Sequence, residues 1–341
     1  MKVLLLGATG LLGHNVLISL LMRGHDVVAL VRNSARLQKP HLVEDAIQQG
    51  RLRIEEDKTS NQTQGKVHSM SVLLQSARGC EAIIDSAGIT DMSVLHFKDY
   101  LPVNVGLCDT LLQVMETLEI RKLVYVSTAN TIGYGSVDKP GHETIDIQYP
   151  FTESWYAQSK LLAEEKLVTA ARNNPHSHVV IVNPGFMVGP YDTKPSSGAL
   201  LVAGYRHRLM ASPRGGKSFI HVHDVAEATV NALTMGRSGE RYLLTGENMS
   251  LKDFYQLQAR VCNYRQSVLV LPNWLVLVAG RLGDLLRGFH IRTQLSSRNV
   301  RQLLVLEYYT NTKASDELKM PHTDIAQSIA DFWRWRNGDE C

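Results

Sequence analysis

A tyrosine and a lysine stand four residues apart in a segment with helical periodicity. Tyr156 and Lys160 lie in SWYAQSKLLAEEKLV, and a spacing of four is about one helical turn, so both side chains share a face. A phenol of pKa ~10 is a poor acid or base at neutral pH, but an adjacent ammonium favours the phenolate. The pair is therefore a candidate proton donor with its activator. Taken alone, such a pair also occurs by chance on exposed helices.

Two hydroxyl side chains end the apolar run KLVYVST. Ser127 or Thr128 could donate a hydrogen bond to a substrate carbonyl oxygen while Tyr156 delivers the proton. The alternative is a pair of hydroxyl residues that only caps the next turn. The position at the end of a strand favours the catalytic interpretation.

A glycine-rich loop follows the first apolar run. In GATGLLG, a tight turn needs Gly7, close approach of a pyrophosphate needs Gly10, and close packing of helix on strand needs Gly13. The following helix offers unpaired N–H groups and its positive dipole end to phosphates. The loop therefore predicts a dinucleotide site, and the alternative is a turn that serves packing alone. The other loop residues assigned to this site are Thr9, Leu11 and Leu12, and Lys160 could bind the nicotinamide ribose.

The end of the second predicted strand indicates which dinucleotide binds. An NAD site normally has a carboxylate about 20 residues beyond the loop, but here the strand ends Val31-Arg32-Asn33, with Arg36 one turn on. A guanidinium suits a 2′-phosphate, so the sequence favours NADP(H) over NAD(H). The alternative is that Arg32 and Arg36 are solvated surface charges. Asp57, after the third strand, could accept from the adenine amino group, although an exposed Asp often follows a strand.

The elements that must position these residues alternate between strand and helix patterns. Short apolar runs at 2–6, 26–31, 52–55, 82–85, 122–127 and 178–183 alternate with helical periodicity, notably at 11–23, 103–118 and 154–171. This alternation predicts an α/β fold with a doubly wound parallel sheet and a ligand crevice at the carboxyl ends of its strands.

The second half of the chain has a different pattern. After the Pro/Gly-rich stretch 184–198, helix patterns at 199–209, 225–235, 251–261, 274–286 and 325–335 dominate, with short strands near 218–222 and 241–244. We expect a nucleotide domain over 1–184 and a smaller, mostly helical substrate lobe over 185–341, with about 218–246 returning to the first domain. Trp274, Leu277 and Leu286, at helical spacing, are expected in the core.

Composition excludes several classes of protein. The chain has 36 Lys and Arg against 33 Asp and Glu, a net charge of +3 that does not suggest nucleic-acid binding. Its four cysteines are far apart, which fits a reducing compartment and no structural zinc. The most apolar stretch, 267–280, is broken by Pro272 and is shorter than the ~18 residues a membrane span needs. No signal-peptide pattern follows Met1, so we expect a cytoplasmic protein with no membrane partner.

These motifs carry a resemblance. GATGLLG, Arg32, Asp57, the SAG at 86–88, YVSTANTIG, YAQSK, NPGFMVGP and FIHVHDVA resemble, in order and spacing, the extended short-chain dehydrogenase/reductase family. Within that family the chain is most similar to the dihydroflavonol 4-reductase-like and 3β-hydroxysteroid dehydrogenase-like branch. The resemblance covers residues 1 to about 250 and continues weakly beyond. It implies a Rossmann domain with a small carboxyl-terminal substrate domain.

The resemblance also implies roles for particular residues. Laying STANTI on the reductase pattern makes Thr128 the catalytic hydroxyl, with Ser127 as fallback, beside Tyr156 as proton donor and Lys160. The segment that covers the nicotinamide would be Pro184, Gly185 and Phe186, and Ala87 and Gly88 would line the cofactor groove.

Two departures from the sugar-nucleotide enzymes of this family favour the reductases. Those epimerases and dehydratases carry Arg-Asp before a Phe-Ile motif, whereas this chain has Lys217-Ser218, so the diphosphate-binding arginine is absent. Nearby Arg206, Arg208, Arg214 and Lys217 could replace it. Ala129 stands where epimerases often have a hydroxyl.

His221, His223 and Asp224 raise the question of a zinc site. On a short strand both histidines would point to one face, but no further ligand stands at a recognised spacing. We expect no metal, one packing histidine, one polar cleft histidine, and Asp224 as the cap of the next helix.

The sequence thus predicts an NADPH-dependent oxidoreductase that reduces a carbonyl, or oxidises a secondary alcohol, of a small organic substrate. Phe186, Met187 and Tyr191 would line its apolar pocket together with residues of 198–215. The alternatives are a sugar-nucleotide epimerase or dehydratase that retains its cofactor and a non-catalytic NADP(H)-sensing protein. The helices at 103–118 and 154–171 could form a homodimer or simply pack on the sheet.

Overall fold

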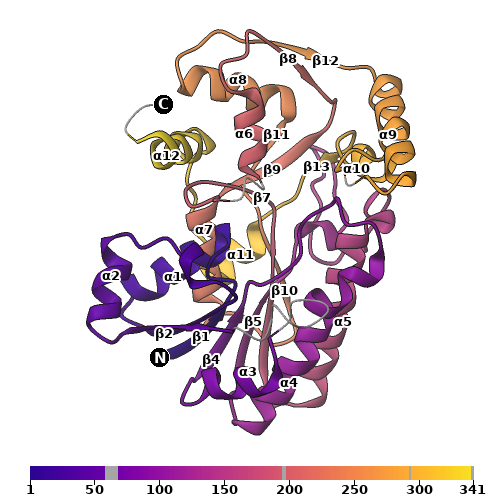
Figure 1. Ribbon diagram of the computed structural model, residues 1–341. Helices are drawn as coiled ribbons and strands as arrows, with labels where there is room; N and C mark the ends of the chain where they lie inside the picture. Colours follow the sequence, from indigo (N-terminus) through magenta and orange to yellow (C-terminus); the bar gives the residue numbers. More distant parts are fainter. Residues whose placement is uncertain (58–67, 194–196, 292, 339–341) are drawn as a thin grey trace.

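A seven-stranded sheet, parallel throughout, forms the centre of the computed structural model (Figure 1). The structure describes residues 1–57, 68–193, 197–291 and 293–338. The strand order is β10-β6-β5-β4-β1-β2-β3. The strands are β1 (Lys2–Leu6), β2 (Asp26–Val31), β3 (Leu52–Glu56), β4 (Ala82–Asp85), β5 (Lys122–Val126), β6 (His178–Pro184) and β10 (Arg241–Leu244). Chain order reverses next to β1, which is where a doubly wound sheet opens its ligand crevice.

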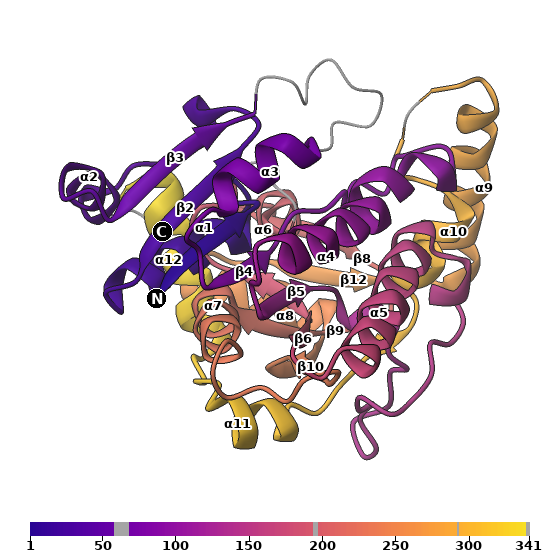
Figure 2. The same ribbon diagram turned by 90° about the horizontal axis from the view of Figure 1, so that it is seen from below.

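Helices cover both faces of this sheet because every buried strand sends alternate side chains to opposite sides (Figure 2). Val3 and Leu5 of β1 pack under one layer of helices, whereas Leu4 and Leu6 pack under the other. The first layer contains α1 (Leu11–Met22), α2 (His41–Gln48), α7 (Val222–Asn231) and α11 (Thr312–Leu318). The second contains α3 (Met70–Ala77), α4 (Leu107–Thr117) and α5 (Trp155–Asn173).

The carboxyl-terminal part forms a lobe beyond the carboxyl ends of the strands (Figure 1). Its strands are β7 (Phe186–Val188), β8 (Leu209–Ser212), β9 (Gly216–His221), β11 (Glu247–Ser250), β12 (Ser267–Val270) and β13 (Leu306–Glu307). Its helices are α6 (Gly198–Gly204), α8 (Leu251–Val261), α9 (Asn273–Gly288), α10 (Ser297–Gln302) and α12 (Ile325–Asn337). Stacked Phe219 and Phe254 rings, with centroids 4.1 Å apart, lie in its core. The chain crosses back to the large sheet through α7 and β10 before re-entering the lobe.

Short helical turns lie between the longer elements. They are η1 (Ser34–Arg36), η3 (Phe97–Asp99), η5 (Ala129–Thr131) and η6 (Phe151–Glu153), together with a π-helical turn, η4 (Pro102–Gly106), that opens α4. A π-turn within a helix is uncommon and often occurs at functional sites. Here it carries Asn104, which contacts the site described below.

Several expectations about the second half are wrong. The helix expected over 199–209 ends at Gly204, and Leu209 begins β8. Trp274 and Leu286 are exposed on α9, and Leu277 is only half-buried, so these three residues are not core. Helical periodicity predicted helix α9 correctly, but the apolar face of this helix points to solvent and not to the core. Within the described residues, no helix is both long enough and apolar enough to cross a membrane.

Candidate active site

A cavity of about 290 Å³ lies at the carboxyl ends of the central strands. It extends from the glycine loop, past the ends of β2, β4 and β5, to α5. Thirteen of the residues expected in the site line it: Gly7, Thr9, Gly10, Leu11, Leu12, Gly13, Arg32, Ala87, Gly88, Ser127, Tyr156, Lys160 and Met187. Its lining fits an extended dinucleotide that runs from a phosphate-binding loop to a Tyr/Lys pair.

The surroundings of the three loop glycines differ, and each position favours glycine for a different physical reason. Gly7 has φ +83°, and a Cβ there would lie 2.6 Å from the Ser86 backbone. A Cβ on Gly13 would lie 2.1 Å from the Gly7 carbonyl oxygen. At Gly10 the nearest protein atom would be 3.4 Å away, so packing within the protein gives no strong reason for glycine. Gly10 is the residue preceding α1, where space and free N–H groups favour a phosphate.

The end of the cavity beside β2 contains Arg32 and a histidine, His68, that sequence reasoning missed. His68 lines the cavity, and its Nδ1 lies 3.0 Å from the buried carboxylate of Asp57. Burial lowers the pKa of His68 despite that carboxylate, and the Arg32 guanidinium nearby lowers it further. Asp57 itself does not line the cavity, and Arg36 is exposed outside it.

Thr128 and Tyr156 are hydrogen-bonded through their side chains, whereas Ser127 is engaged elsewhere. The Ser127 hydroxyl donates to Glu164, a buried carboxylate on α5 that also accepts from Thr131 Oγ1 (2.7 Å) and Asn183 Nδ2 (2.7 Å). Glu164 thereby holds together the ends of β5 and β6 and the turn that follows Thr128. The hydroxyl paired with Tyr156 is therefore that of Thr128, which is not itself among the residues that line the cavity.

Burial favours the protonated phenol of Tyr156 at neutral pH. Burial raises its pKa to about 12, the Thr128 hydrogen bond lowers it, and the Glu164 charge raises it. The expected lowering by Lys160 is not found, because the ammonium of Lys160 is directed to other partners. Nζ donates to the Val126 carbonyl oxygen (2.8 Å) and to the Tyr125 hydroxyl (3.1 Å).

Lys160 is buried among groups that hold its ammonium in place. Burial lowers its pKa, and the buried carboxylate of Asp85, at the end of β4, is the strongest opposing influence. Burial raises the pKa of Asp85 to about 6, with Lys160 acting against that rise. A Cβ on Gly88 would lie 3.3 Å from Lys160 Nζ, so the SAG segment passes directly over the ammonium.

Asn104 joins three elements beneath the site. Its Nδ2 donates to Ser159 Oγ (2.9 Å) and to the Ile89 carbonyl oxygen, and its Oδ1 accepts from Ile89 N–H. Its backbone carbonyl oxygen accepts from the Tyr125 hydroxyl at 3.2 Å. A continuous hydrogen-bonded path therefore runs from Lys160 through Tyr125 to Asn104. Sequence reasoning missed Asn104. The signal that could have found it is its position at the start of the predicted helix 103–118.

Most of the residues expected to contact the substrate lie outside the cavity lining, and neighbouring residues line the cavity instead. Met187, Asp192 and Thr193 line the cavity, but Phe186 packs against Phe219 with ring centroids 5.2 Å apart. Tyr191 lies outside the lining, with its ring 4.2 Å from that of His14. Pro184 ends β6, and a Cβ on Gly185 would lie 2.7 Å from the Ser218 carbonyl oxygen. This segment thus joins sheet and lobe, and Met187 is the expected substrate residue that reaches the cavity.

His221 and His223 do not share a strand. His221 ends β9, and His223 lies in the first turn of α7. His221 Nδ1 accepts from the His223 N–H at 2.9 Å, so His221, not Asp224, caps α7. Asp224 instead accepts two hydrogen bonds from Thr323. The expectation of a shared face and of an Asp224 cap is wrong, because β9 ends one residue earlier than the pattern suggested.

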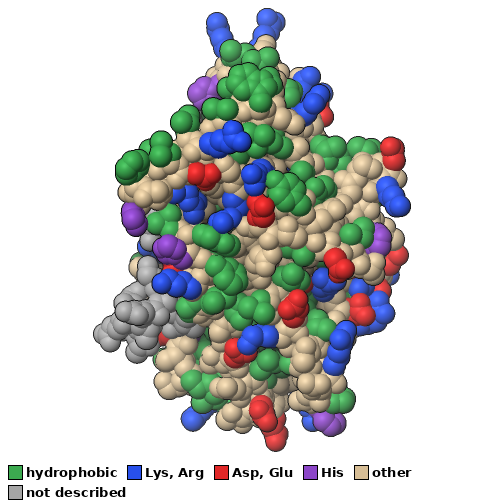
Figure 3. All heavy atoms as spheres, turned by 90° about the vertical axis from the view of Figure 1, so that its right-hand side faces the viewer, with side chains coloured by type: hydrophobic (Ala, Val, Ile, Leu, Met, Phe, Trp, Pro, Cys, Tyr) green, Lys and Arg blue, Asp and Glu red, His purple; other side chains and the backbone are tan. Residues whose placement is uncertain are grey.

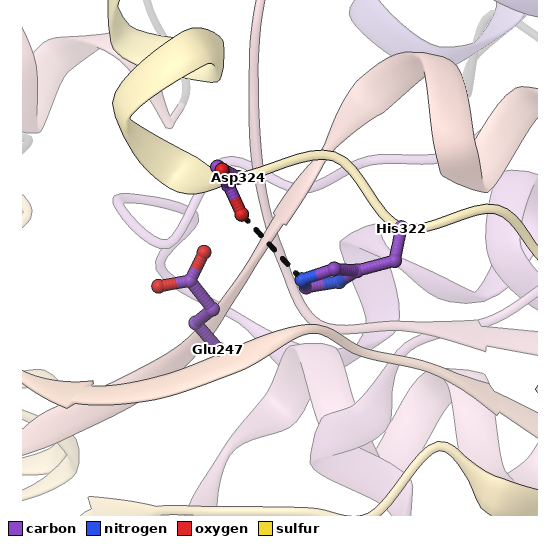
Figure 4. Close-up of side chains that lie close together, drawn as sticks. All are labelled: Glu247, His322 and Asp324. Carbon is purple, nitrogen blue, oxygen red and sulfur yellow. Dashed lines mark ion pairs between the residues drawn. The ribbon is translucent and has the colours of Figure 1, made fainter.

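Among the residues described, three possible ligand groups meet elsewhere: Glu247, His322 and Asp324, with ligand atoms within 4.8 Å of one another (Figure 4). His322 and Asp324 are exposed, and Glu247 already accepts from Ile325 N–H (2.8 Å) at the start of α12. The arrangement is explained as a helix cap with an exposed ion pair.

Known proteins that are similar to this chain in sequence or in structure are named as reductases and epimerases, among others. A Synechocystis sp. protein provisionally named dihydroflavonol 4-reductase is 27% identical over 96% of this chain and 92% of its own. The sterol demethylase protein B of Methylococcus capsulatus is 26% identical over 98% of both. Among solved structures, a nucleoside-diphosphate-sugar epimerase from Pseudomonas aeruginosa superposes with a TM-score of 0.70 at 23% identity, covering 100% of this chain and 99% of that one.

The fold and the site define the class of extended short-chain dehydrogenases/reductases, oxidoreductase-type enzymes built on a Rossmann sheet. Residues 3–245 match the model of the NAD dependent epimerase/dehydratase family, and the chain belongs to that family.

Proposed function

We propose that this protein is an NADPH-dependent reductase that converts a carbonyl of a small organic substrate to an alcohol, or catalyses the reverse oxidation. The observation that carries the proposal is the hydrogen bond from Thr128 to Tyr156, a residue that lines the cavity together with Lys160. Two hydroxyls that meet at one point can both contact a single carbonyl oxygen.

Thr128 and Tyr156 have different roles in the proton transfer. Thr128 donates to the carbonyl oxygen and fixes its position, and Tyr156 gives its phenolic proton to that oxygen as the C–H bond forms. A bound nicotinamide supplies the hydride to the carbonyl carbon. Because the neutral phenol dominates when Tyr156 is buried, the site is already protonated for reduction. Lys160 binds the nicotinamide ribose, and the Tyr125–Asn104 path holds its ammonium in place.

Arg32 supports the choice of NADPH. Its side chain is exposed and lines the adenosine end of the cavity, where a guanidinium can bind a 2′-phosphate through two charge-assisted hydrogen bonds. We place the pyrophosphate over Gly10 at the start of α1, and the nicotinamide ribose beside Lys160.

An epimerase or dehydratase acting on a sugar nucleotide is the nearest alternative. Its substrate diphosphate requires a cation near Lys217, but Lys217 forms a largely buried ion pair with Glu307 of β13. A lysine neutralised in this way is a poor phosphate ligand, because binding would break the pair and leave Glu307 buried and uncompensated. This pairing favours the reductase over the sugar-nucleotide enzyme.

The test is oxidation of NADPH, followed at equal concentrations of NADPH and NADH, across a panel of aldehydes and apolar ketones. The proposal expects net NADPH consumption that is lost in Tyr156→Phe. A tightly copurifying nucleotide with no net consumption would instead favour the epimerase. Tight NADPH binding with no turnover of any substrate, in a panel that includes sugar nucleotides, would favour a sensing protein.

A further inference from the structure

The helix α9 carries its apolar side chains on the outside of the molecule. Seven of them are between 38% and 70% exposed: Trp274, Leu275, Val278, Leu282, Leu285, Leu286 and Phe289. At about 100° per residue they fall within an arc of about 120°. We call these seven residues the α9 arc. An amphipathic helix of a soluble protein normally turns such an arc inward.

The opposite side of α9 already has its packing partner. Val276, Gly280 and Gly283 are the buried residues of the helix. A Cβ on Gly280 would lie 2.5 Å from the Val300 side chain of α10, and one on Gly283 would lie 2.0 Å from the Leu295 carbonyl oxygen. The glycines let α9 approach its neighbours closely, so the helix is held without using the arc. The α9 arc is therefore free for a partner outside the fold.

The apolar surface continues from α9 to the tip of the lobe. The strand β12, which runs directly into α9, exposes Leu269 and Val270, and its neighbour β8 exposes Leu209. Figure 3, which views the side where α9 lies in Figure 1, shows hydrophobic side chains gathered in the upper part of this face, with Lys and Arg side chains among them. Single exposed apolar residues are ordinary, but a continuous patch marks an interaction site.

Positive charge is concentrated in the same part of the chain. Residues 205–217 and 265–301 together contain ten Lys and Arg but a single Asp, and two of the ten pair with carboxylates from elsewhere in the chain, Lys217 with Glu307 and Arg301 with Glu153. The remainder of the chain is net negative, since the whole has 36 basic against 33 acidic residues. Arg206, Arg208, Arg265 and Arg281 are exposed. An apolar patch with a basic surround on a near-neutral protein is complementary to an apolar phase with an anionic surface.

A second copy of this chain fits the surface less well. A two-fold symmetric contact brings the same patch of both copies together, so the surrounding arginines would face one another. Like charges facing each other across an interface are unfavourable, whereas anionic lipid headgroups would neutralise them. The charge pattern therefore favours a lipid surface over self-association.

We propose that the α9 arc docks this protein peripherally onto an anionic lipid bilayer. At sixteen residues, with Arg281 and Asp284 inside it, α9 is too short and too charged to span the hydrocarbon core, so it lies in the interface plane. Trp274 sits at the headgroup level, where its ring is favourable, and the leucines enter the acyl boundary. This proposal replaces the expectation of no membrane partner.

Docking would also orient the enzyme. Arg287, at the end of α9, donates to the Met92 and Val94 carbonyl oxygens, in the segment that follows the SAG over Lys160. These hydrogen bonds connect α9 to the segment that follows the SAG residues of the site. Access of an apolar substrate from the bilayer would follow from this arrangement, but that consequence rests on the proposed function and the docking itself does not.

The test is flotation of the full chain with vesicles of phosphatidylcholine alone or mixed with phosphatidylglycerol. We expect binding to the mixed vesicles that weakens as salt is added, and a drop in partitioning of about tenfold or more in Leu282→Asp and in Leu285→Asp. Met22→Asp is the matched control, since Met22 is 67% exposed on α1 and distant in the chain from the α9 arc. It should bind as the unaltered protein does.

Two further measurements decide between occupants. Tryptophan emission should shift to the blue on addition of mixed vesicles, and Trp274→Phe should remove most of that shift. Light scattering reports whether the free protein is a dimer and whether Leu282→Asp makes it a monomer. Failure to bind mixed vesicles, equal binding by Leu282→Asp, or a dimer abolished by that substitution would each overturn the proposal. None of these measurements uses turnover, so they are independent of the reductase assignment.

Discussion

The ammonium of Lys160 donates a hydrogen bond of 3.1 Å to the hydroxyl of Tyr125, a residue of the central strand β5. Tyr125 is fully buried in β5, and burial raises the pKa of its phenol well above the ordinary value, so the hydroxyl stays protonated. It accepts from Lys160 and donates to the Asn104 carbonyl oxygen, which fixes the direction of both bonds. Tyr125 is thus a positioning residue for the ammonium of Lys160.

Tyr125→Phe is predicted to lower kcat by about tenfold while the protein remains folded, because a hydrogen bond to a charged group is lost but the buried ring stays. The ammonium still lies 4.5 Å from the ring centroid and keeps that attraction. The pH profile of kcat should shift as Lys160 loses its fixed position. Tyr134→Phe, which removes a hydroxyl bonded to the Tyr149 carbonyl oxygen, is the control. Equal effects of both substitutions would show that Tyr125 has no special role.

Thr128→Ala should reduce kcat by about a hundredfold, the size expected when a donor to a developing oxyanion is removed. Thr128→Ser keeps the hydroxyl and should retain most activity. Tyr156→Phe should lose at least about a hundredfold, since no other proton donor replaces it, while NADPH binding measured by fluorescence is retained. If Thr128→Ala were as active as the unaltered enzyme, the proposed pairing would be wrong.

Arg32→Ala should raise KM for NADPH by about tenfold or more and leave KM for NADH nearly unchanged, because a charge-assisted phosphate contact is removed. Arg36→Ala is the matched control, since Arg36 is exposed outside the cavity lining. Glu56, at the end of β3, accepts from Ser34 N–H at 3.0 Å close to the same strand ends. A lower KM for NADH than for NADPH in the unaltered enzyme would mean that a carboxylate such as Glu56 governs the choice instead.

Sequence reasoning reached the parallel sheet because its evidence is local. Each central strand is a short apolar run, and Gly13 is dictated by its contact with the Gly7 carbonyl oxygen within one β-turn-α unit, while Gly7 adopts a φ of +83° in the same turn. Residues joined by tertiary contacts were missed: Glu164, His68 and Asn104 meet their partners 11 to 55 positions away. Periodicity also cannot tell whether an apolar face is covered, as Trp274 and Leu286 show. Long-range contacts and the covering of an apolar face depend on which elements pack together in the fold, and a single sequence does not show this.

Acid should destabilise the protein through His14. Burial on α1 lowers the pKa of this histidine to about 4, so the folded state favours the neutral imidazole, whereas the unfolded chain titrates near 6.5. The contribution is therefore fully present above about pH 6.5 and is lost as pH falls towards 4, on the order of 3 kcal/mol in total. His14→Leu should show a smaller loss of urea-unfolding free energy over that interval, and the exposed His41→Leu should behave like the unaltered chain. Parallel pH profiles for His14→Leu and the unaltered protein would rule out His14 as the origin of the acid sensitivity.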